Sequence, residues 1–521
     1  MRRHLLAIAL VATALASLML LDHPVDTRDA EPPQKAPRPA LSRKGATTST
    51  WYCAAGSAGT GDATTHELVV FNPTGADVDV VISTFFARRE AAAPATTETT
   101  TEPATTTSTE SPTTTVVAGP STQKVAVAGR SSLVVPLATP GASAMVEFAA
   151  VGPVVTHRLV IEGSFDEAPC ATSASAVAYF PTANTETAKG ASSQLWLFNP
   201  FPADVSVDVQ VASEDGVRTP GQLRGLVVAG GSSRAVELGG IVQTRDQFAM
   251  ALRVRGGVIV AEQSRLEPGG GGLVLTPGVP ATSTRLVFAD GRSGGGIGER
   301  FVVYNPGDEE ASVLLQVVPF DTDLQSLPEK FDLAVPPRRY MVLDLQDQVR
   351  VPSDRPHWVR LESVNGAQVV VQRLAQLLAE GSPWALRSGV GGSVGQPVMA
   401  RRWTMPWADR SAESTSTLVV VNPSTDTIAR VKVSRIAAGS RAPVGSEIEL
   451  APSGGVAIEL GPAGAEPAGI EIEASSPVVS ERRVAAASGG DLAVIPMIGR
   501  NGEFAELPSM SHTTAVELGG G

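Results

Sequence analysis

Four stretches of the sequence each run from an apolar strand into the dipeptide Asn-Pro. They read ELVVFNPTGADVDVVIS (67–83), LWLFNPFPADVSVDVQV (195–211), FVVYNPGDEEASVLLQV (301–317) and LVVVNPSTDTIARVKV (418–433). Proline cannot donate to a sheet ladder, so it ends the strand before it and holds the preceding residue in an extended conformation. An apolar strand ending in Asn-Pro that recurs four times at wide spacing predicts a repeated structural unit.

Each predicted unit has the same order of short strands. An aromatic or apolar strand precedes the Asn-Pro strand, and an alternating strand, a hairpin with Gly or Pro in its turn and a closing pair follow it. About seven strands in roughly 100 residues predict an all-β chain of four tandem immunoglobulin-like antiparallel β-sandwiches. The predicted boundaries are 1–21 for a signal peptide or signal anchor, 22–49 for a disordered linker, 50–172, 173–283, 284–398 and 399–500 for the sandwiches, and 501–521 for a disordered tail. Glycine-rich stretches at 267–272 and 388–397 are expected to be joints.

The N-terminus predicts export. Arg2 and Arg3 precede an apolar run over residues 5–21, which is typical of a signal segment. Cleavage after Ala16 would release the chain, whereas an uncleaved run would anchor it in the cytoplasmic membrane through residues 5–21. The positive flank stays inside in either case, so the bulk of the chain is expected to be extracytoplasmic. The Thr-rich insertion 91–119 suits O-glycosylation or a plain solvated loop.

The cysteine count fits an oxidising compartment. Cys53 and Cys170 are the chain's 2 cysteines, and an even pair in an exported protein usually forms one bridge. The alternatives are a metal site or redox thiols, but no histidine or carboxylate partner stands at a ligand-like spacing near them. The sequence therefore favours a Cys53–Cys170 disulfide.

The Asn-Pro dipeptides are interpreted as structural turns. The asparagine side chain can accept from backbone N–H groups two residues on and close an Asx turn, which an acidic residue shortly afterwards could also support. The alternative is a repeated ion or ligand site. The eight turn residues are Asn72, Pro73, Asn199, Pro200, Asn305, Pro306, Asn422 and Pro423, and the acidic residues are Asp77, Asp204, Asp308 and Asp426.

Polar pairs recur on the closing strands. They are aligned by sequence as His157-Arg158, Glu262-Gln263, Gln372-Arg373 and Glu481-Arg482. One interpretation is a surface or inter-sheet hydrogen bond that ties strands together. The other is a contact line for a partner or a neighbouring domain.

No catalytic, metal or cofactor site is predicted. The net charge of −12 argues against a nucleic-acid partner, and the histidines lack metal-ligand spacing. Residues 391–395 match G-x-S-x-G, but Pro397 disfavours the helix that a nucleophile elbow requires. Trp403 and Trp407, with Arg401, Arg402 and Arg410 nearby, are possible ligand contacts for a sugar, although aromatic residues at such a strand are more often core.

These features together carry a family resemblance. The Trp51-Tyr52-Cys53 start, the second cysteine and closing strands such as 478–482 (VVSER) resemble an uncharacterised family of exported actinobacterial proteins, classed as a domain of unknown function. The resemblance covers most of the chain after residue 50. The first three units depart from the Glu-Arg ending. The resemblance implies no known activity and no catalytic residues.

The sequence thus predicts a non-catalytic, membrane-anchored scaffold or binding protein of the bacterial cell envelope. Its expected partner is another envelope protein or a cell-surface glycan, with no small-molecule cofactor. The alternative is an accessory or adaptor subunit of a glycan-assembly or secretion complex. A wall-polysaccharide hydrolase is a third hypothesis, which lacks a convergent acid–base set.

Overall fold

The computed structural model describes twelve segments of the chain. They are residues 48–56, 64–88, 120–137, 142–267, 271–294, 296–320, 327–378, 387–407, 414–460, 467–486, 491–500 and 503–510. All of them belong to one compact unit, Pro37–Gly521; the other unit, Met1–Ala36, lies outside them. The predicted signal segment 1–21, nearly all of the linker 22–49 and the Thr-rich insertion 91–119 also lie outside the described residues.

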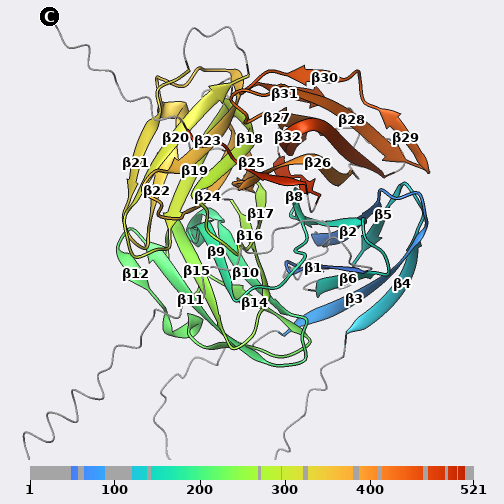
Figure 1. Cartoon of the computed structure of the whole chain (residues 1–521). Helices are drawn as coiled ribbons and strands as arrows, with labels where there is room; N and C mark the ends of the chain where they lie inside the picture. The colour runs from blue at the N-terminus through green and yellow to red at the C-terminus, as the bar shows by residue number, and fades with distance from the viewer. Residues whose placement is uncertain are drawn as a thin grey trace, which may run out of the picture. The chain divides into compact units, whose positions relative to one another are not determined.

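The described residues form β-strands, which pair antiparallel except for β3 with β14, and this confirms the all-β prediction (Figure 1). Repeat 1 contains β1 (Ser49–Cys53), β2 (Thr64–Asn72), β3 (Val78–Arg88), β4 (Ser121–Val127), β5 (Ser131–Pro136), β6 (Ala142–Phe148), β7 (Val154–Ile161) and β8 (Ser164–Pro169). Repeat 2 contains β9 (Val177–Ala183), β10 (Ser192–Asn199), β11 (Val205–Ser213), β12 (Gly216–Arg218), β13 (Leu226–Val228), β14 (Ser232–Glu237), β15 (Phe248–Arg255), β16 (Val260–Leu266) and β17 (Leu273–Pro277).

The second half follows the same plan. Repeat 3 contains β18 (Arg285–Ser293), β19 (Ile297–Asn305), β20 (Ala311–Pro319), β21 (Phe331–Val335), β22 (Arg339–Asp344), β23 (Arg355–Ser363), β24 (Val370–Leu378) and β25 (Arg387–Val394). Repeat 4 contains β26 (Val398–Trp407), β27 (Ser414–Val421), β28 (Ala429–Ala437), β29 (Ser440–Pro443), β30 (Ile448–Leu450), β31 (Gly455–Glu459), β32 (Ala468–Ala486), β33 (Leu492–Pro496), β34 (Ile498–Gly499) and β35 (Phe504–Glu506).

Helical structure in this part of the chain is confined to 3-10 turns. They are η2 (Thr187–Lys189), η3 (Gly221–Leu223) and η5 (Leu345–Asp347). None of the helical turns in the described part of the chain has the length or apolar character that a bilayer crossing requires.

Each repeat is a sandwich of two sheets with one strand order. In repeat 3 the layers are β18-β23-β20-β21 and β22-β19-β24-β25, and in repeat 1 they are β1-β6-β3-β4 and β5-β2-β7-β8. The long β32 belongs to both layers of repeat 4, and β3 pairs in parallel with β14, which joins a sheet of repeat 1 to one of repeat 2. Each repeat has more than the seven strands expected from the sequence, and in each a final strand follows the closing pair; these final strands are β8, β17, β25 and β33.

Each buried asparagine closes its corner through its side chain. The Nδ2 group of Asn199 donates to the carbonyls of Ala203 (2.8 Å) and Val228 (3.2 Å), and its Oδ1 accepts from the backbone N–H of Phe201 (3.1 Å). The same three kinds of bond recur at Asn72, Asn305 and Asn422, and all four asparagines are fully buried. The geometry is that of the predicted Asx turn.

The acidic residues after the corners act in two ways. Asp77 and Asp204 accept a backbone N–H from the facing turn, at 2.9 and 2.8 Å. Asp308 instead pairs with the Arg338 guanidinium, and Asp426 accepts from nearby hydroxyls. Every one of them therefore supports its corner.

The Asn-Pro strand is buried on both faces. The residue before each asparagine points away from its own core and contacts the preceding repeat, with repeat 4 preceding repeat 1. Phe198, for example, lies against Phe85 with ring centroids 5.0 Å apart, and Tyr304 lies against Tyr179 at 6.5 Å. The equivalent residues in the other repeats are Phe71 and Val421. Burial on both faces explains why these strands are continuously apolar rather than alternating.

The final strands of the repeats contact one another in a closed cycle. Strand β8 contacts β17, β17 contacts β25, β25 contacts β33, and β33 contacts β8. Glycines allow this approach, because a Cβ at Gly272 would lie 2.5 Å from the Val390 nitrogen and one at Gly392 would lie 2.5 Å from Val274. The expected joint 388–397 is therefore wrong over 388–394, which belong to β25.

The predicted disordered tail also needs correction. Residues Phe504–Glu506 form β35, which pairs with β26, and Leu507 and Met510 are buried. Apolar side chains at 507 and 510 drive this segment onto repeats 3 and 4. Residues 511–521 lie outside the described residues.

Substituting a corner asparagine is expected to destabilise the protein strongly. Asn199→Ala removes three hydrogen bonds at a fully buried position and leaves carbonyls unpaired. We expect a loss of about 2–4 kcal/mol in the free energy of unfolding, measured by urea titration. Gln123→Ala, on the exposed side of β4, is the matched control and should change stability by less than about 0.5 kcal/mol. Equal stability of the two variants would contradict the corner role.

Candidate functional site

The polar pairs of the closing strands lie between repeats rather than on the surface. By strand register, the residues opposite the third position before each asparagine are Thr156, Glu262, Gln372 and Glu481, and the residues after them are His157, Gln263, Arg373 and Arg482. All eight are 2% exposed or less. The sequence alignment of repeat 1 was thus one residue late, because His157 is equivalent to Gln263 and not to Glu262.

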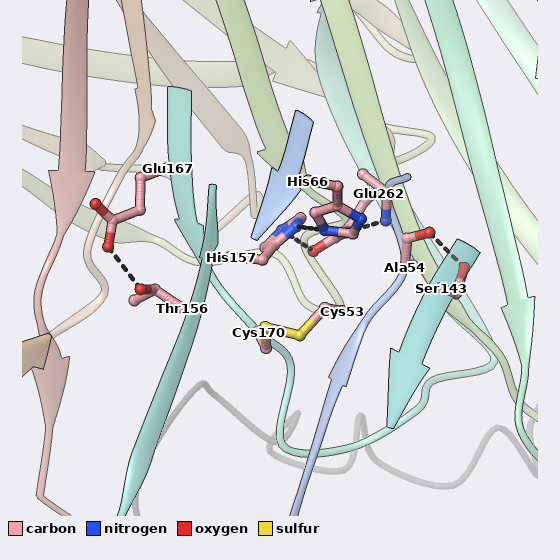
Figure 2. The surroundings of a disulfide bond; sticks show 10 residues. Cys53, Ala54, His66, Ser143, Thr156, His157, Glu167, Cys170 and Glu262 are labelled. Atoms are coloured by element: carbon pink, nitrogen blue, oxygen red, sulfur yellow. Dashed lines mark hydrogen bonds and ion pairs between the residues drawn. A yellow bond between two sulfur atoms is a disulfide. The ribbon is translucent and has the colours of Figure 1, made fainter. Parts of the chain in front are cut away.

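Two junctions show how these groups join neighbouring repeats. Between repeats 1 and 2, His157 Nε2 lies 3.3 Å from Glu262, whose carboxylate also accepts the Ala55 N–H (Figure 2). His157 Nδ1 lies 3.1 Å from His66 Nε2. Burial and the neighbouring His157 lower the pKa of His66 to about 3, so this ring is neutral. These contacts join repeats 1 and 2 through buried polar side chains.

The junction between repeats 3 and 4 is built from charged groups. Arg373 lies 3.5 Å from both Glu481 and Glu299, and the Asp290 N–H donates to Glu481 at 2.8 Å. Burial alone would lower the pKa of Arg373, but these carboxylates outweigh it and raise the pKa above its usual value. Glu299 also lies 2.7 Å from His357. A buried ion pair of this kind fixes the geometry of the two repeats but costs desolvation.

The disulfide lies beside the first of these junctions. Cys53 and Cys170 are joined, with Cα atoms 4.7 Å apart, in agreement with the sequence interpretation (Figure 2). The bridge ties the first strand of repeat 1 to the residue that follows β8. Both cysteines are fully buried in the core of repeat 1.

The centre of the strand cycle is not a ligand site. A cavity there, lined by residues of β8, β17, β25 and β33, measures about 10 Å³, the lower limit for one water molecule. Ser393 of the G-x-S-x-G match lies within β25 and is 3% exposed, so it is not on a strand-to-helix elbow. Within the described residues, no group of three or more His, Cys, Asp or Glu side chains could hold a metal ion.

An arginine-rich pocket lies beside the first Asn-Pro corner. Its volume is about 430 Å³, and repeats 1 and 4 both contribute to it. Pro73, Thr74, Gly75, Arg130 and Gly152 come from repeat 1. The lining residues from repeat 4 and the segment after it are Arg402, Trp403, Thr404, Arg441, Glu471, Glu473 and Arg500.

Two of the four arginines are held by carboxylates. Arg441 lies 2.6 Å from Glu471, and this hydrogen-bonded pair raises the pKa of Arg441 above its usual value. Arg402 lies 3.8 Å from both Glu473 and Glu503. These ion pairs fix the positions of the Arg402 and Arg441 guanidinium groups. They also leave the nearby carboxylates paired with arginine.

The other two arginines are held through their backbones. The Arg130 N–H donates to the Thr74 carbonyl at 2.7 Å, its own carbonyl accepts from Gly439 of repeat 4 at 3.1 Å, and its φ is 55°. The Arg500 N–H donates to the Arg402 carbonyl at 3.1 Å. Both side chains are exposed, and neither has a carboxylate partner among the described residues. Their guanidinium groups are therefore available to an anion, whose carboxylate or phosphate geometry they match.

The structure corrects the two predicted tryptophan ligand contacts on β26. Trp403 and Trp407 are each 1% exposed, and the Trp403 Nε1–H donates to the carbonyls of Ala400 and Val478, so neither ring offers a face to a sugar. Both fill the core of repeat 4 because they alternate inward on β26. Arg402 lines the pocket, whereas Arg410 lies outside the described residues. No sequence pattern links Arg130, Arg441 and Arg500, which tertiary structure alone brings together.

The fold is a tandem all-β arrangement with an arginine-rich pocket lined by repeats 1 and 4. The chain belongs to the family of unknown function DUF5719, which matches residues 167–287 and 275–517. The predicted membership of an uncharacterised domain family is thus confirmed. No curated protein matches the chain.

Similarities to solved structures are remote. One is the structure titled "Crystal Structure of Thermotoga maritima 1070", with 20% identity, 22% of this chain and 94% of that chain covered, and a TM-score of 0.19. Another is a glycosyl hydrolase family 2 member from Bacteroides cellulosilyticus DSM 14838, with 10% identity, 47% of this chain and 29% of that chain covered, and a TM-score of 0.10. Neither similarity bears on function.

Removing a carboxylate from the buried ion pair should destabilise the protein. Glu481→Ala leaves Arg373 with less compensation at a fully buried position and removes the acceptor for the Asp290 N–H. We expect a loss of about 3–5 kcal/mol in the free energy of unfolding, measured by urea titration. Glu459→Ala, an exposed glutamate in the same repeat, should cost less than about 0.5 kcal/mol. A small effect at Glu481 would show that this network does not hold the repeats together.

Asp491 should make stability depend on pH. Burial raises its pKa from 3.8 to about 6, although N–H donors from Phe165 and Leu492 and the charge of Arg158 oppose the shift. The folded state therefore binds more protons than the unfolded state between these values, and its stability falls as pH rises through this window. The difference corresponds to about 3 kcal/mol.

The measurement compares the wild type with Asp491→Ala. Titrating groups that do not interact with Asp491 cancel in the difference, whereas the variant also loses the effect of Asp491 on Asp166. The stability of the wild type relative to the variant should decrease between pH 4 and pH 7 by up to about 3 kcal/mol. A difference that stays constant or increases over this range would contradict the raised pKa.

Proposed function

We propose that the protein is a non-catalytic, extracytoplasmic binding protein of an actinobacterial cell envelope, anchored to the membrane through residues 5–21. Its arginine pocket recognises an anionic group, carboxylate or phosphate, on an envelope polymer. The single observation that carries this proposal is the presence of Arg130 and Arg500, exposed and without carboxylate partners, in one pocket of about 430 Å³.

The net charge of the whole chain also favours binding of an anion at one local site. With a net charge of −12, the protein repels polyanions in general, so a local cluster of guanidinium groups confines binding to one place. A guanidinium group can donate two parallel hydrogen bonds to a carboxylate or phosphate. The corner residues Thr74 and Gly75 also line the pocket, where their backbone groups can contact the rest of a sugar or polyol.

The non-catalytic part of the proposal rests on how the pocket carboxylates are used. Glu471 lies 2.6 Å from Arg441 and Glu473 lies 3.7 Å from the same side chain. A general acid needs a raised pKa and a general base needs free access to a proton. Carboxylates that are paired with arginine are suited to neither role. The disulfide supports the extracytoplasmic location.

Neutralising the two available arginines should abolish anion binding. Titration calorimetry of the full-length protein would use an oligogalacturonate as the carboxylate probe and a glycerol-phosphate oligomer as the phosphate probe. Arg130→Gln combined with Arg500→Gln should weaken binding of the preferred probe by about tenfold or more, because each charge-assisted contact contributes about 1.5–3 kcal/mol. Wild-type binding should also weaken as salt increases.

Arg218→Gln is the matched control, because Arg218 is exposed on β12 and does not line the pocket. It should bind as the wild type does. Unchanged binding by the double variant would refute the proposed site. Binding of neither probe by the wild type would instead favour an adaptor that contacts another envelope protein.

A further inference from the structure

The four junctions between consecutive repeats are variants of one arrangement. At each, an Asn-Pro corner lies beside the sheet that contains the first strand of the preceding repeat. At the junction of repeats 1 and 2 the corner residue Phe201 meets Tyr52, with ring centroids 6.5 Å apart. At the junction of repeats 3 and 4, Leu507, Pro508 and Met510 lie beside Pro423, and the cavity is about 10 Å³. Both junctions are thus filled by the chain itself.

The other two junctions are open. The arginine pocket is one, and the second is a pocket of about 530 Å³ between repeats 2 and 3. Its wall includes the corner residues Pro306 and Gly307, which are equivalent to Pro73 and Thr74 of the arginine pocket. Apolar side chains lie against the corner at two junctions, whereas mainly polar groups surround a space at the other two, which makes the second space a candidate binding site.

The lining of the second pocket differs in charge from that of the first. The Asp308 carboxylate and the Arg338 guanidinium pair at 2.6 Å, so among the described lining residues Arg253 is the one cation without a carboxylate partner. The remaining side chains are Tyr179, Gln210, Thr282 and Gln368. Amide, hydroxyl and aromatic groups are suited to the hydroxyls and ring faces of a neutral sugar rather than to an anion.

Contacts with neighbouring side chains fix the positions of several polar groups in this pocket. The Thr282 hydroxyl donates to Gln368 Oε1 at 2.5 Å, which leaves the Gln368 amide N–H groups as donors. Tyr179 is held edge-on against the buried Tyr304 at 6.5 Å. Burial raises the pKa of Tyr179, so its hydroxyl is protonated and can donate.

We propose that the pocket between repeats 2 and 3 is a second binding site, which takes a neutral, hydroxyl-rich saccharide segment. Tyr179 offers a ring surface, and Gln210 and Gln368 offer amide groups to the hydroxyls. The site stands independently of the arginine pocket. If both sites bind, a polymer with acidic and neutral segments engages one chain at two points and gains avidity.

The test measures binding of neutral trisaccharides to the full-length protein. The probes are maltotriose, mannotriose and triacetylchitotriose, followed by saturation-transfer NMR and titration calorimetry. At least one should bind, and Gln210→Ala combined with Gln368→Ala should weaken it by about tenfold or more. Thr282→Trp, which fills the pocket, should weaken it similarly without depending on the loss of a hydrogen bond.

Two controls separate this site from the arginine pocket. Gln123→Ala, an exposed glutamine on β4, should bind the trisaccharide as the wild type does. Arg130→Gln combined with Arg500→Gln should do so as well. Failure of all three trisaccharides to bind, or unchanged binding by both pocket variants, would overturn the second site. If the same samples still bind the anionic probe, the arginine pocket is retained even though the second site is refuted.

Discussion

The rest of the structure depends on the burial of the Asn-Pro strands on both faces. One face of each strand completes the core of its own sandwich, and the other lies against the preceding repeat through Phe71, Phe198, Tyr304 or Val421. Burying a large apolar side chain contributes about 1.5–3 kcal/mol, so these four contacts favour a fixed arrangement of the repeats. Flexible tandem domains would leave these residues in water.

The asparagine matters because such a strand must stop abruptly between two sandwiches. The backbone of the strand leaves the sheet next to carbonyl groups of two other segments, which need hydrogen-bond donors because water has little access to them. A fully buried amide with two donors and an acceptor satisfies these groups at once. The corner that results is also a wall at each junction, which is why the open pockets contain corner residues such as Pro73 and Pro306.

Buried polar groups and glycines complete the contacts between repeats. The ion pairs of Arg373 and the His157–Glu262 contact lie where the closing strands meet the neighbouring repeat, and glycines at 272 and 392 permit the close approach of the final strands. The glycine-rich stretches suggested joints because glycine is common in linkers. Here it serves close packing instead, a distinction that depends on what lies opposite each residue. The polar pairs are visible in the sequence, but their burial follows only from the contact between repeats.

The sequence by itself determined the all-β class, the repetition, the Asx-type corner and the pairing of Cys53 with Cys170, because each is a local pattern or a matter of counting. It also carried an unused signal: continuous apolar runs before each Asn-Pro indicate strands covered on both sides. Only the tertiary structure decided that Trp403 and Trp407 are core, and that Arg130, Arg402, Arg441 and Arg500 share one pocket. The physical reason is that side-chain burial and the assembly of a pocket depend on contacts between distant repeats, which no local spacing encodes.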